Sequence, residues 1–325
     1  MDLKSKYHKI VFLCPGQGSQ HIGMGYDFYK SLPEGREVFQ EIDEAISYNL
    51  SKLIFYGDIE ELTKTQNAQP ALLAVSVAAW RCLAKNLNIT SISDFFIVGA
   101  GHSLGEYSAL CIANSINLNT ASNLVYKRGI FMNNAIPLNV GGMVALLGTD
   151  IKTACAIAEE SQTEVANDNG YGQIVISGTN TNIEKLLKIV PNYDIKKAIK
   201  LHVSSPFHSS IMRPASDDMK KVLLESDIKE PEIPIFSNFT AKTQKDPENI
   251  KNNLIEQISN RVRWAEIMES IVKDYKCNII IELGSGKVLG NLSKRMYPNL
   301  KVYNIECMRD IDIIFNELNL LEIEN

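Results

Sequence analysis

Short apolar runs alternate along the chain with stretches whose apolar residues recur at helical spacing. The run Ile10–Leu13 predicts a buried strand that ends at a glycine-rich loop, and Phe95–Val98 predicts a second strand before a glycine cluster. Helical spacing extends over Ala121–Ala135, and Pro137 ends it. Strands that alternate with helices in this way are typical of the α/β class.

The middle third of the chain has a pattern of its own. Strands are expected at Met143–Leu147, Glu164–Asp168, Ile174–Ser177 and Ile195–Val203, and helices at Ile151–Glu160 and Asn182–Val190. This order, β-α-β-β-α-β, is that of a ferredoxin-like unit. Beyond it, strands are expected at Pro234–Asn238 and Asn278–Glu282. We therefore expect residues 1–138 and 204–325 to form an α/β-hydrolase-like domain with a parallel sheet, and residues 139–203 to form a ferredoxin-like insertion.

Composition narrows the class of protein. Apolar residues make up 45% and charged residues 22% of the 325 residues, as in ordinary globular proteins. A formal net charge of −5 argues against general nucleic-acid binding, which needs a basic surface. The longest apolar stretch, Ala71–Trp80, is too short to span a membrane, and the N-terminal apolar run is too short for a secretion signal.

Cysteine usage favours a reducing compartment. The closest two of the six cysteines, Cys82 and Cys111, are 29 positions apart, so the chain has no C-x-x-C pair for zinc or dithiol chemistry. A chain of this length can bury a core without disulfides. We therefore expect a cytoplasmic protein with no metal site.

A serine between two glycines is the sharpest chemical feature. Gly101-His102-Ser103-Leu104-Gly105 has the G-x-S-x-G spacing and stands between a predicted strand and a predicted helix. Such a turn exposes a nucleophilic hydroxyl, and the N-terminus of the following helix stabilises an oxyanion nearby. The alternative is a strand–helix turn that merely needs glycines.

A serine nucleophile needs a base, and the chain has five histidines. His102 adjoins the serine, where neighbouring side chains diverge, and His202 falls in a predicted strand, where a packed histidine is the ordinary case. His208 follows Pro206 in an irregular stretch and is free to point into a cleft. Spacing alone does not decide whether His208 is the base.

Several motifs in fixed order resemble a known family. They are Pro15-Gly16-Gln17-Gly18-Ser19-Gln20, Gly101-His102-Ser103-Leu104-Gly105-Glu106-Tyr107-Ser108-Ala109, Arg128-Gly129, Asn167-Asp168-Asn169, Gly172-Gln173-Ile174-Val175-Ile176-Ser177-Gly178, Pro206-Phe207-His208 and Gln257. Together they resemble the malonyl-CoA:acyl carrier protein transacylases of bacterial type II fatty acid synthesis. The resemblance covers nearly the whole chain.

The resemblance implies a role for each matching residue. Ser103 would take the malonyl group from coenzyme A and pass it to the phosphopantetheine thiol of acyl carrier protein, with His208 as the base. A backbone carbonyl near Gln257 would orient that base, and backbone N–H groups of Gln17 and Leu104 would form the oxyanion hole. No bound cofactor is implied, because the coenzyme A thioester is itself the substrate.

The same resemblance suggests how the substrate is selected. Arg128 would hold the free carboxylate of malonate with two parallel hydrogen bonds, which a lysine cannot reproduce. From the residues alone, Arg128 is better interpreted as a solvated helix residue. Met132, one turn on, is either pocket wall or core, and Asn167 is expected at the pocket. Phe207 would disfavour an α-methyl group, so methylmalonyl-CoA is expected to be a poor substrate; a core aromatic is equally compatible.

Other functions fit less well. An α/β-hydrolase such as an esterase or thioesterase places its histidine late, whereas no histidine follows His208. A patatin-like hydrolase usually has an Asp-Gly pair, which this chain lacks. The segments Gly16–His21 and Gly284–Val288 do not match the dinucleotide-binding and P-loop patterns, respectively.

Two further functions are close to the one that the resemblance implies. An acyltransferase that loads a polyketide synthase is chemically the same enzyme with a different carrier, and a non-catalytic carrier-binding subunit is disfavoured by the intact motifs. The lysines at 196, 197 and 200 form a solvated face or meet an acidic carrier protein.

Overall fold

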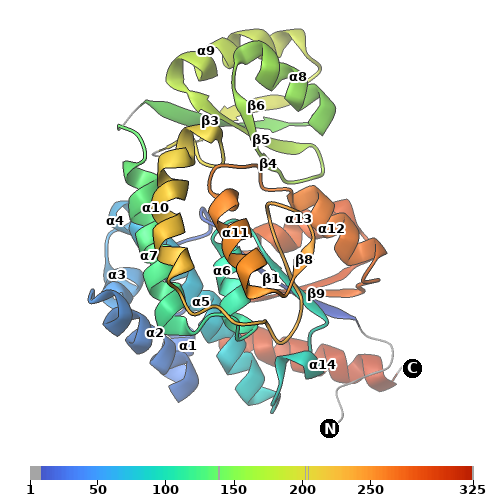
Figure 1. Cartoon of the computed structure of the whole chain (residues 1–325). Helices are drawn as coiled ribbons and strands as arrows, with labels where there is room; N and C mark the ends of the chain where they lie inside the picture. The colour runs from blue at the N-terminus through green and yellow to red at the C-terminus, as the bar shows by residue number, and fades with distance from the viewer. Residues whose placement is uncertain (1–8, 138–139, 202, 204, 324–325) are drawn as a thin grey trace.

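The computed structural model describes residues 9–137, 140–201, 203 and 205–323. Figure 1 shows a smaller sheet with two helices, α8 and α9, above a larger part that contains the remaining helices. The sheets are separate, one six-stranded and one four-stranded.

The larger sheet is mostly parallel. Its order is β10-β9-β1-β2-β7-β8, and only the β7–β8 pair is antiparallel. The strands are β1 (Ile10–Cys14), β2 (Val98–Gly101), β7 (Ile235–Phe236), β8 (Thr243–Gln244), β9 (Ile279–Leu283) and β10 (Lys301–Ile305). Cys14 is paired with Gly101, so β1 and β2 end side by side. The loops that follow these strands therefore emerge at one edge of the sheet.

Helices bury both faces of this sheet. The helices of the larger part are α1 (Tyr26–Ser31), α2 (Pro33–Ile46), α3 (Leu50–Tyr56), α4 (Ile59–Thr63), α5 (Thr65–Asn86), α6 (Gly105–Ile112), α7 (Leu118–Asn134), α10 (Arg213–Leu224), α11 (Pro247–Gln257), α12 (Trp264–Lys273), α13 (Val288–Met296) and α14 (Met308–Ile323). Ile10, Phe12 and Cys14 of β1 pack with residues of α2, α5, α6 and α7, whereas Val11 and Leu13 pack with residues of α12 and α13. This two-sided burial explains why β1 is a continuous apolar run.

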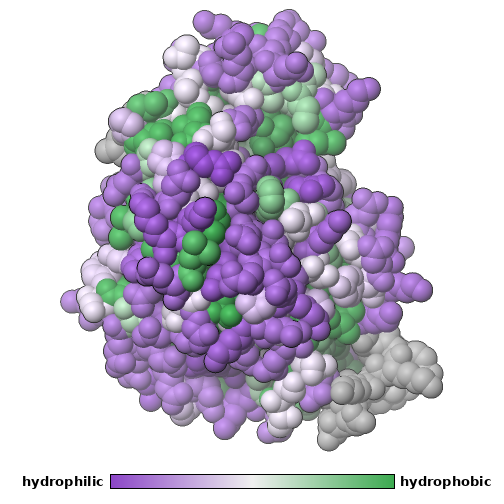
Figure 2. Space-filling view, in the orientation of Figure 1, coloured by the Kyte–Doolittle hydropathy of each residue, from purple (hydrophilic) through white to green (hydrophobic). Residues whose placement is uncertain are grey.

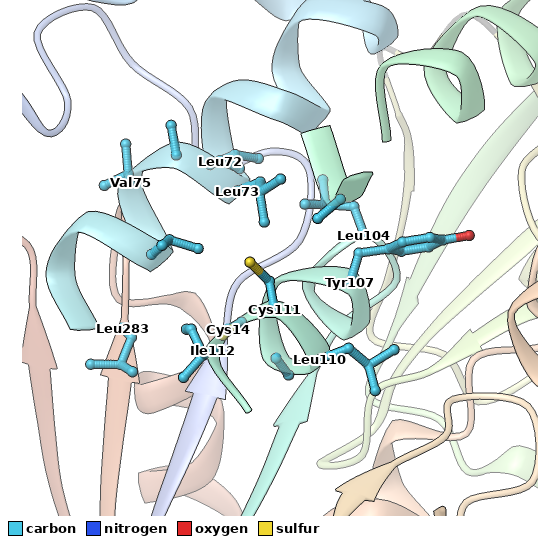
Figure 3. Packing of buried hydrophobic residues seen from close by; sticks show 14 of the residues in the cluster. Cys14, Leu72, Leu73, Val75, Leu104, Tyr107, Leu110, Cys111, Ile112 and Leu283 are labelled. Atoms are coloured by element: carbon cyan, nitrogen blue, oxygen red, sulfur yellow. The ribbon is translucent and has the colours of Figure 1, made fainter. Parts of the chain in front are cut away.

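The core around β1 contains two of the cysteines. In Figure 3, Cys14 at the end of β1 and Cys111 on α6 lie among leucine and valine side chains of α5. The apolar stretch Ala71–Trp80 is part of α5, which is buried on nearly all sides. A helix that is apolar all round belongs in a core. None of the helices described has an apolar stretch long enough to cross a bilayer.

The smaller sheet is antiparallel, with the order β4-β5-β3-β6. Its elements are β3 (Gly141–Leu147), α8 (Ile151–Ser161), β4 (Glu164–Asp168), β5 (Gln173–Thr179), α9 (Asn180–Ile189) and β6 (Lys197–Lys200). This is the strand order of a ferredoxin-like unit, and its helices and strands share a core of their own. The expected fold class, a parallel α/β sheet with a separate antiparallel unit, is confirmed. The domain boundaries stay a prediction, and residues 138, 139 and 204 beside them lie outside the described residues.

Backbone contacts join the two sheets. Val262, just before α12, donates its N–H to the Ala166 carbonyl, and its own carbonyl accepts from the Asp168 N–H. The edge strand β4 of the smaller sheet is therefore held against the larger part. On the face shown in Figure 2, hydrophilic residues predominate over the lower part, and hydrophobic patches gather in the band between the upper and lower parts.

Three strand predictions need correction. The second strand begins at Val98, not Phe95, because Phe95 and Phe96 pack in the core just after a short 3-10 helix, Ile92–Asp94. The expected strand Ile195–Val203 is shorter, Lys197–Lys200, and pairs along one edge only. The strand Pro234–Asn238 contains only Ile235 and Phe236 in regular pairing.

The turn after β2 tolerates no side chain at its first glycine. A Cβ on Gly101 would lie 1.8 Å from the carbonyl oxygen of Gly105, which is backbone and cannot move aside. We expect Gly101→Ala to destabilise the protein by about 1–3 kcal/mol or more, measured as the free energy of unfolding in urea. Gly142→Ala is the matched control, because its Cβ meets only the side-chain oxygen of Asn180, at 3.3 Å. Equal stability of the two variants would contradict the close approach.

Candidate active site

A cavity of about 330 Å³ lies between the two sheets, at the carboxyl ends of the parallel strands. The loop after β1 contributes Gln17, the turn after β2 contributes Ser103 and Leu104, and α13 after β9 contributes Leu292. The smaller sheet and the segment beyond it line the other side, with Met143, Asn167, Gln173, Val175, Leu201, Val203 and Phe207. Ligands of open α/β sheets bind at this edge of the strands.

Ser103 occupies a strained turn between β2 and α6. Its φ of +53° lies in the left-handed region, which non-glycine residues rarely adopt. The side chain of Asn238, which follows β7, accepts a hydrogen bond from the Ser103 N–H at 2.6 Å and donates to the Gly101 carbonyl at 2.7 Å. The strained backbone is therefore fixed by one amide, and strain of this kind clusters at functional sites.

His208 reaches Ser103 from the opposite wall. Its Nε2 lies 2.8 Å from the Ser103 Oγ. Its Nδ1 lies 2.9 Å from the backbone carbonyl of Gln257, which can only accept, so Nδ1 carries the proton and Nε2 is free to accept one. Burial, together with the positive charge of Arg128, lowers the pKa of His208 to about 3. His208 is thus a neutral imidazole over the ordinary pH range.

Arg128 is buried rather than solvated, which corrects the interpretation drawn from the residues alone. It is 1% exposed, and its Nη2 donates to the Ser103 Oγ at 3.0 Å and to the Gln257 side-chain oxygen at 2.9 Å. Its Nη1 donates to Gln69 Oε1 at 2.7 Å. Throughout the part of the chain that the structure describes, no carboxylate forms an ion pair with this guanidinium, and its buried Nε has no hydrogen-bond partner. The site therefore holds, beside a hydroxyl, a positive charge that no carboxylate contacts directly.

The remaining predicted residues have the following places. Gln17, Leu104, Met132, Phe207 and Asn167 all line the cavity. Among the residues described, the backbone N–H groups of Gln17 and Leu104 have no intramolecular acceptor, as an oxyanion hole requires. Met132 is both wall and core, since it lines the cavity and is 2% exposed. Gln257 does not line it and acts from behind His208.

Of the other histidines, His102 turns away from the serine, as expected. Its Nε2 lies 2.8 Å from the Asn169 side-chain oxygen, and its ring lies 5.4 Å from that of Trp264. His8 and His202 lie outside the described residues. No group of histidines, cysteines and acids suited to a metal ion is found within the described ranges.

Sequence reasoning missed three residues of this site. Asn238 fixes the Ser103 backbone, Gln69 holds Arg128, and Glu106 accepts hydrogen bonds from the Asn238 and Gln257 amides. The signals available were that Asn238 is the last residue of a predicted strand and that Glu106 belongs to the motif around Ser103. A strand's carboxyl end is recognisable as part of a site only once its position in the sheet is known.

The arrangement is suited to acyl transfer. A hydroxyl lies beside a neutral base, two free amides face the same cavity, and a guanidinium stands ready for an anion. Groups in these positions activate a nucleophile, stabilise the negative oxygen of a tetrahedral intermediate and bind a substrate carboxylate.

Known proteins are similar to this chain in both sequence and fold. The acyl transferase domain family matches residues 11–300. The malonyl CoA-acyl carrier protein transacylase of Bacillus subtilis (strain 168) is 41% identical over 315 residues, which are 95% of this chain and 97% of the relative. The protein of the same name from Haemophilus influenzae is 36% identical over 301 residues, 91% of this chain and 95% of the relative.

Solved structures agree along nearly their whole length. The acyl-carrier-protein-S-malonyltransferase of Bartonella henselae has a TM-score of 0.92 and 39% identity, covering 96% of this chain and 99% of that one. A malonyl-transacylase in complex with its type II PKS acyl-carrier protein has a TM-score of 0.89 and 34% identity, covering 95% of this chain and 99% of that one.

Proposed function

The chain belongs to the acyl transferase domain family, and we propose that it moves malonyl groups from malonyl-CoA to an acyl carrier protein as an ester on Ser103. One observation carries this proposal. The Ser103 Oγ contacts both the His208 Nε2 and the guanidinium of Arg128, which forms no ion pair with any described carboxylate. A nucleophile beside an unpaired cation fits an acyl group that ends in a carboxylate.

In the first half-reaction, His208 Nε2 takes the hydroxyl proton while the Ser103 Oγ attacks the thioester carbonyl. The carbonyl oxygen becomes negative, and the N–H groups of Gln17 and Leu104 stabilise it. When the carbon–sulfur bond breaks, the departing coenzyme A sulfur takes the proton from His208. The enzyme then carries a malonyl ester and a neutral imidazole.

The second half-reaction runs the same steps in reverse. His208 takes the proton of the phosphopantetheine thiol, the sulfur attacks the ester carbonyl, and Ser103 leaves as the alcohol with that proton. Every step is an acyl or proton transfer, so atoms and electrons balance without a redox partner. We therefore propose that the reaction uses no cofactor beyond its coenzyme A thioester.

Arg128 accounts for the choice of malonyl. Without substrate, Nη2 donates to the Ser103 Oγ, and once that oxygen becomes part of an ester the donor is free to bind a carboxylate. Leaving a buried charge of this kind unpaired costs about 2–5 kcal/mol, which separates malonyl from neutral acyl groups. Phe207 lines the same cavity, and we propose that its ring leaves little room for an α-methyl group.

Two kinds of carrier protein are candidates to receive the malonyl group. The relatives named above transfer malonyl to acyl carrier protein, which supports fatty acid synthesis as the destination. A structural neighbour serves a type II PKS carrier, so a polyketide carrier is the second candidate. A serine hydrolase is disfavoured, because the orienting group of His208 is a backbone carbonyl and not an acid. We propose a cytoplasmic location, which the six unpaired cysteines support.

Removal of the nucleophile tests the covalent step. Incubation with malonyl-CoA should add the mass of one malonyl group to the intact protein, and a carrier bearing phosphopantetheine should remove it. Ser103→Ala should abolish the adduct, because it removes the hydroxyl that lies 2.8 Å from the His208 Nε2 and would carry the ester. Ser270→Ala, which changes a partly exposed serine of α12 whose hydroxyl contacts Asp274, should keep it. An adduct that persists in Ser103→Ala would refute the assignment.

Replacement of Arg128 tests acyl selection. Arg128→Ala should lower the rate of acylation by malonyl-CoA at least about thirtyfold more than that by acetyl-CoA, because only malonyl loses a charge partner. Arg128→Lys retains the charge without the two parallel bonds and should be intermediate. The measurement compares the two acylation rates by intact mass. Equal losses with both substrates would show that Arg128 is structural.

Lys196, Lys197 and Lys200 on and beside β6 are exposed, and we propose that they meet the acidic carrier protein. Lys197→Glu with Lys200→Glu should raise KM for the carrier severalfold and affect acylation by malonyl-CoA less, because only the carrier needs the edge of β6. Lys152→Glu on α8 is the control, with an equal change of charge per site. An unchanged carrier KM in the double variant would exclude this surface.

A further inference from the structure

A buried carboxylate lies beside the nucleophile and takes no part in the steps above. Glu106 is in the first turn of α6, and it is 0% exposed. Its Oε2 accepts hydrogen bonds from the Asn238 backbone N–H at 2.9 Å and from the Gln257 side-chain amide at 2.8 Å. Its Oε1 accepts from the Gln244 side-chain amide at 2.8 Å. A buried acid with three donors is a built feature and not an accident of packing.

Two of the three amides that Glu106 binds belong to residues that hold the reacting groups. Asn238 fixes the Ser103 N–H through its side chain. The Gln257 side chain donates to the Ser103 carbonyl at 3.0 Å and accepts from Arg128, while the Gln257 backbone carbonyl orients His208. Each of the three groups of the proposed mechanism is thus one residue away from Glu106.

The Gln257 amide also places a neutral group between two charges. Its Nε2 donates to Glu106, and its Oε1 accepts from the Arg128 guanidinium. Glu106 therefore supplies a negative charge near Arg128 without bonding to it. A direct ion pair would occupy the guanidinium and compete with the substrate carboxylate. The interposed amide orients the guanidinium and leaves its charge available.

We propose that Glu106, in its ionised form, is the positioning residue for malonyl transfer, holding Gln257 and Asn238 so that Ser103, His208 and Arg128 keep their geometry. This proposal rests on the function proposed above for Ser103. Only an ionised carboxylate accepts from all three donors at full strength, and protonation of either oxygen weakens these bonds.

Burial raises the pKa of Glu106 to about 7, against the opposing effect of its hydrogen bonds and of Arg128. The charged or titratable groups that act on it are Arg128 on α7 and Tyr107 on α6, while His208 contacts the backbone carbonyl of its partner Gln257. Its partners from α11, β8 and the β7–β8 loop are uncharged amides. Because the pKa of His208 is about 3, protonation of the base does not account for a loss of activity near neutral pH, whereas protonation of Glu106 does.

The test is the pH dependence of Ser103 malonylation, followed by rapid quench and intact mass with malonyl-CoA. In the unmodified protein the rate should fall about tenfold between about pH 8 and about pH 6, as a group with a pKa near 7 takes up its proton. Glu106→Gln should be slower at the higher pH and should lose this dependence, because a glutamine cannot titrate. A substrate group that titrates would act alike in both proteins.

A second variant keeps the proposal testable if Glu106→Gln does not fold. Gln244 donates to Glu106 and touches none of Ser103, His208 and Arg128. Gln244→Met removes one donor from the carboxylate, which should raise its pKa and move the acidic fall in rate to higher pH. An acidic fall that stays in place in Gln244→Met, or that persists in Glu106→Gln, would overturn the proposal.

Glu282 is the matched control. It too is buried, has a pKa raised to about 7 by burial, and accepts three hydrogen bonds, from the Leu289 and Gly290 N–H groups and from Asn304. Glu282→Gln should keep the acidic fall. If no adduct forms in any of these proteins, the function proposed for Ser103 is wrong. If the adduct forms and the Glu106 and Gln244 variants keep the pH dependence of the unmodified protein, only the positioning role of Glu106 is wrong.

Discussion

The site depends on a buried positive charge that only neutral acceptors hold. Arg128 donates to Gln69, Gln257 and the Ser103 hydroxyl, all of them weaker partners than a carboxylate. Burying a cation in this way is unfavourable unless an anion joins it. Glu106 is separated from the guanidinium by the Gln257 side chain, so no carboxylate contacts Arg128 directly, and we propose that the carboxylate of the substrate binds there. In the proposed reaction one group serves both selectivity and catalysis, since Nη2 also contacts the Ser103 Oγ.

The larger sheet places the nucleophile and its neighbours at one edge, because the parallel strands end side by side. Parallel pairing sets β9, β1, β2 and β7 side by side, so the segments after them emerge at one edge. They supply, in that order, the wall of α13, the Gln17 amide, the Ser103 turn and Asn238. The smaller sheet closes the cavity from the other side, and Val262 fixes its position. The segments that follow the strands of the larger sheet thus carry the nucleophile and the Gln17 amide. Most of the opposite wall of the cavity comes from the smaller sheet and the segment beyond it.

Local pattern was enough to predict the strand–turn–helix around Ser103 and the β-α-β-β-α-β unit, because turn glycines and apolar periodicity are properties of neighbouring residues. Contacts between residues that are distant in the sequence could not be predicted from this local pattern. Helical spacing marks the face of Arg128 but does not say what covers that face, and its partner Gln69 lies 59 positions earlier. Spacing alone left the base open among several histidines, and only the resemblance implied His208, whose Nδ1 lies 2.9 Å from the Gln257 carbonyl in the structure. Asn238 and Glu106 were named only as part of a predicted strand and of the motif around Ser103, and no role was predicted for either, since their partners are distant in the sequence.

The depth of the core around β1 has a consequence for an enzyme whose product and acceptor both carry free sulfhydryls. Cys14 ends the strand that leads into the site, and its carbonyl accepts from the His102 N–H, yet the thiol is fully buried and burial raises its pKa well above the ordinary value. Cys111 is also buried, with its pKa raised to about 12. Mixed disulfides form through thiolates that solvent can reach. No cysteine is among the described residues that line the cavity, so oxidised coenzyme A or pantetheine bound there meets the Ser103 hydroxyl and no thiol with which to form a mixed disulfide.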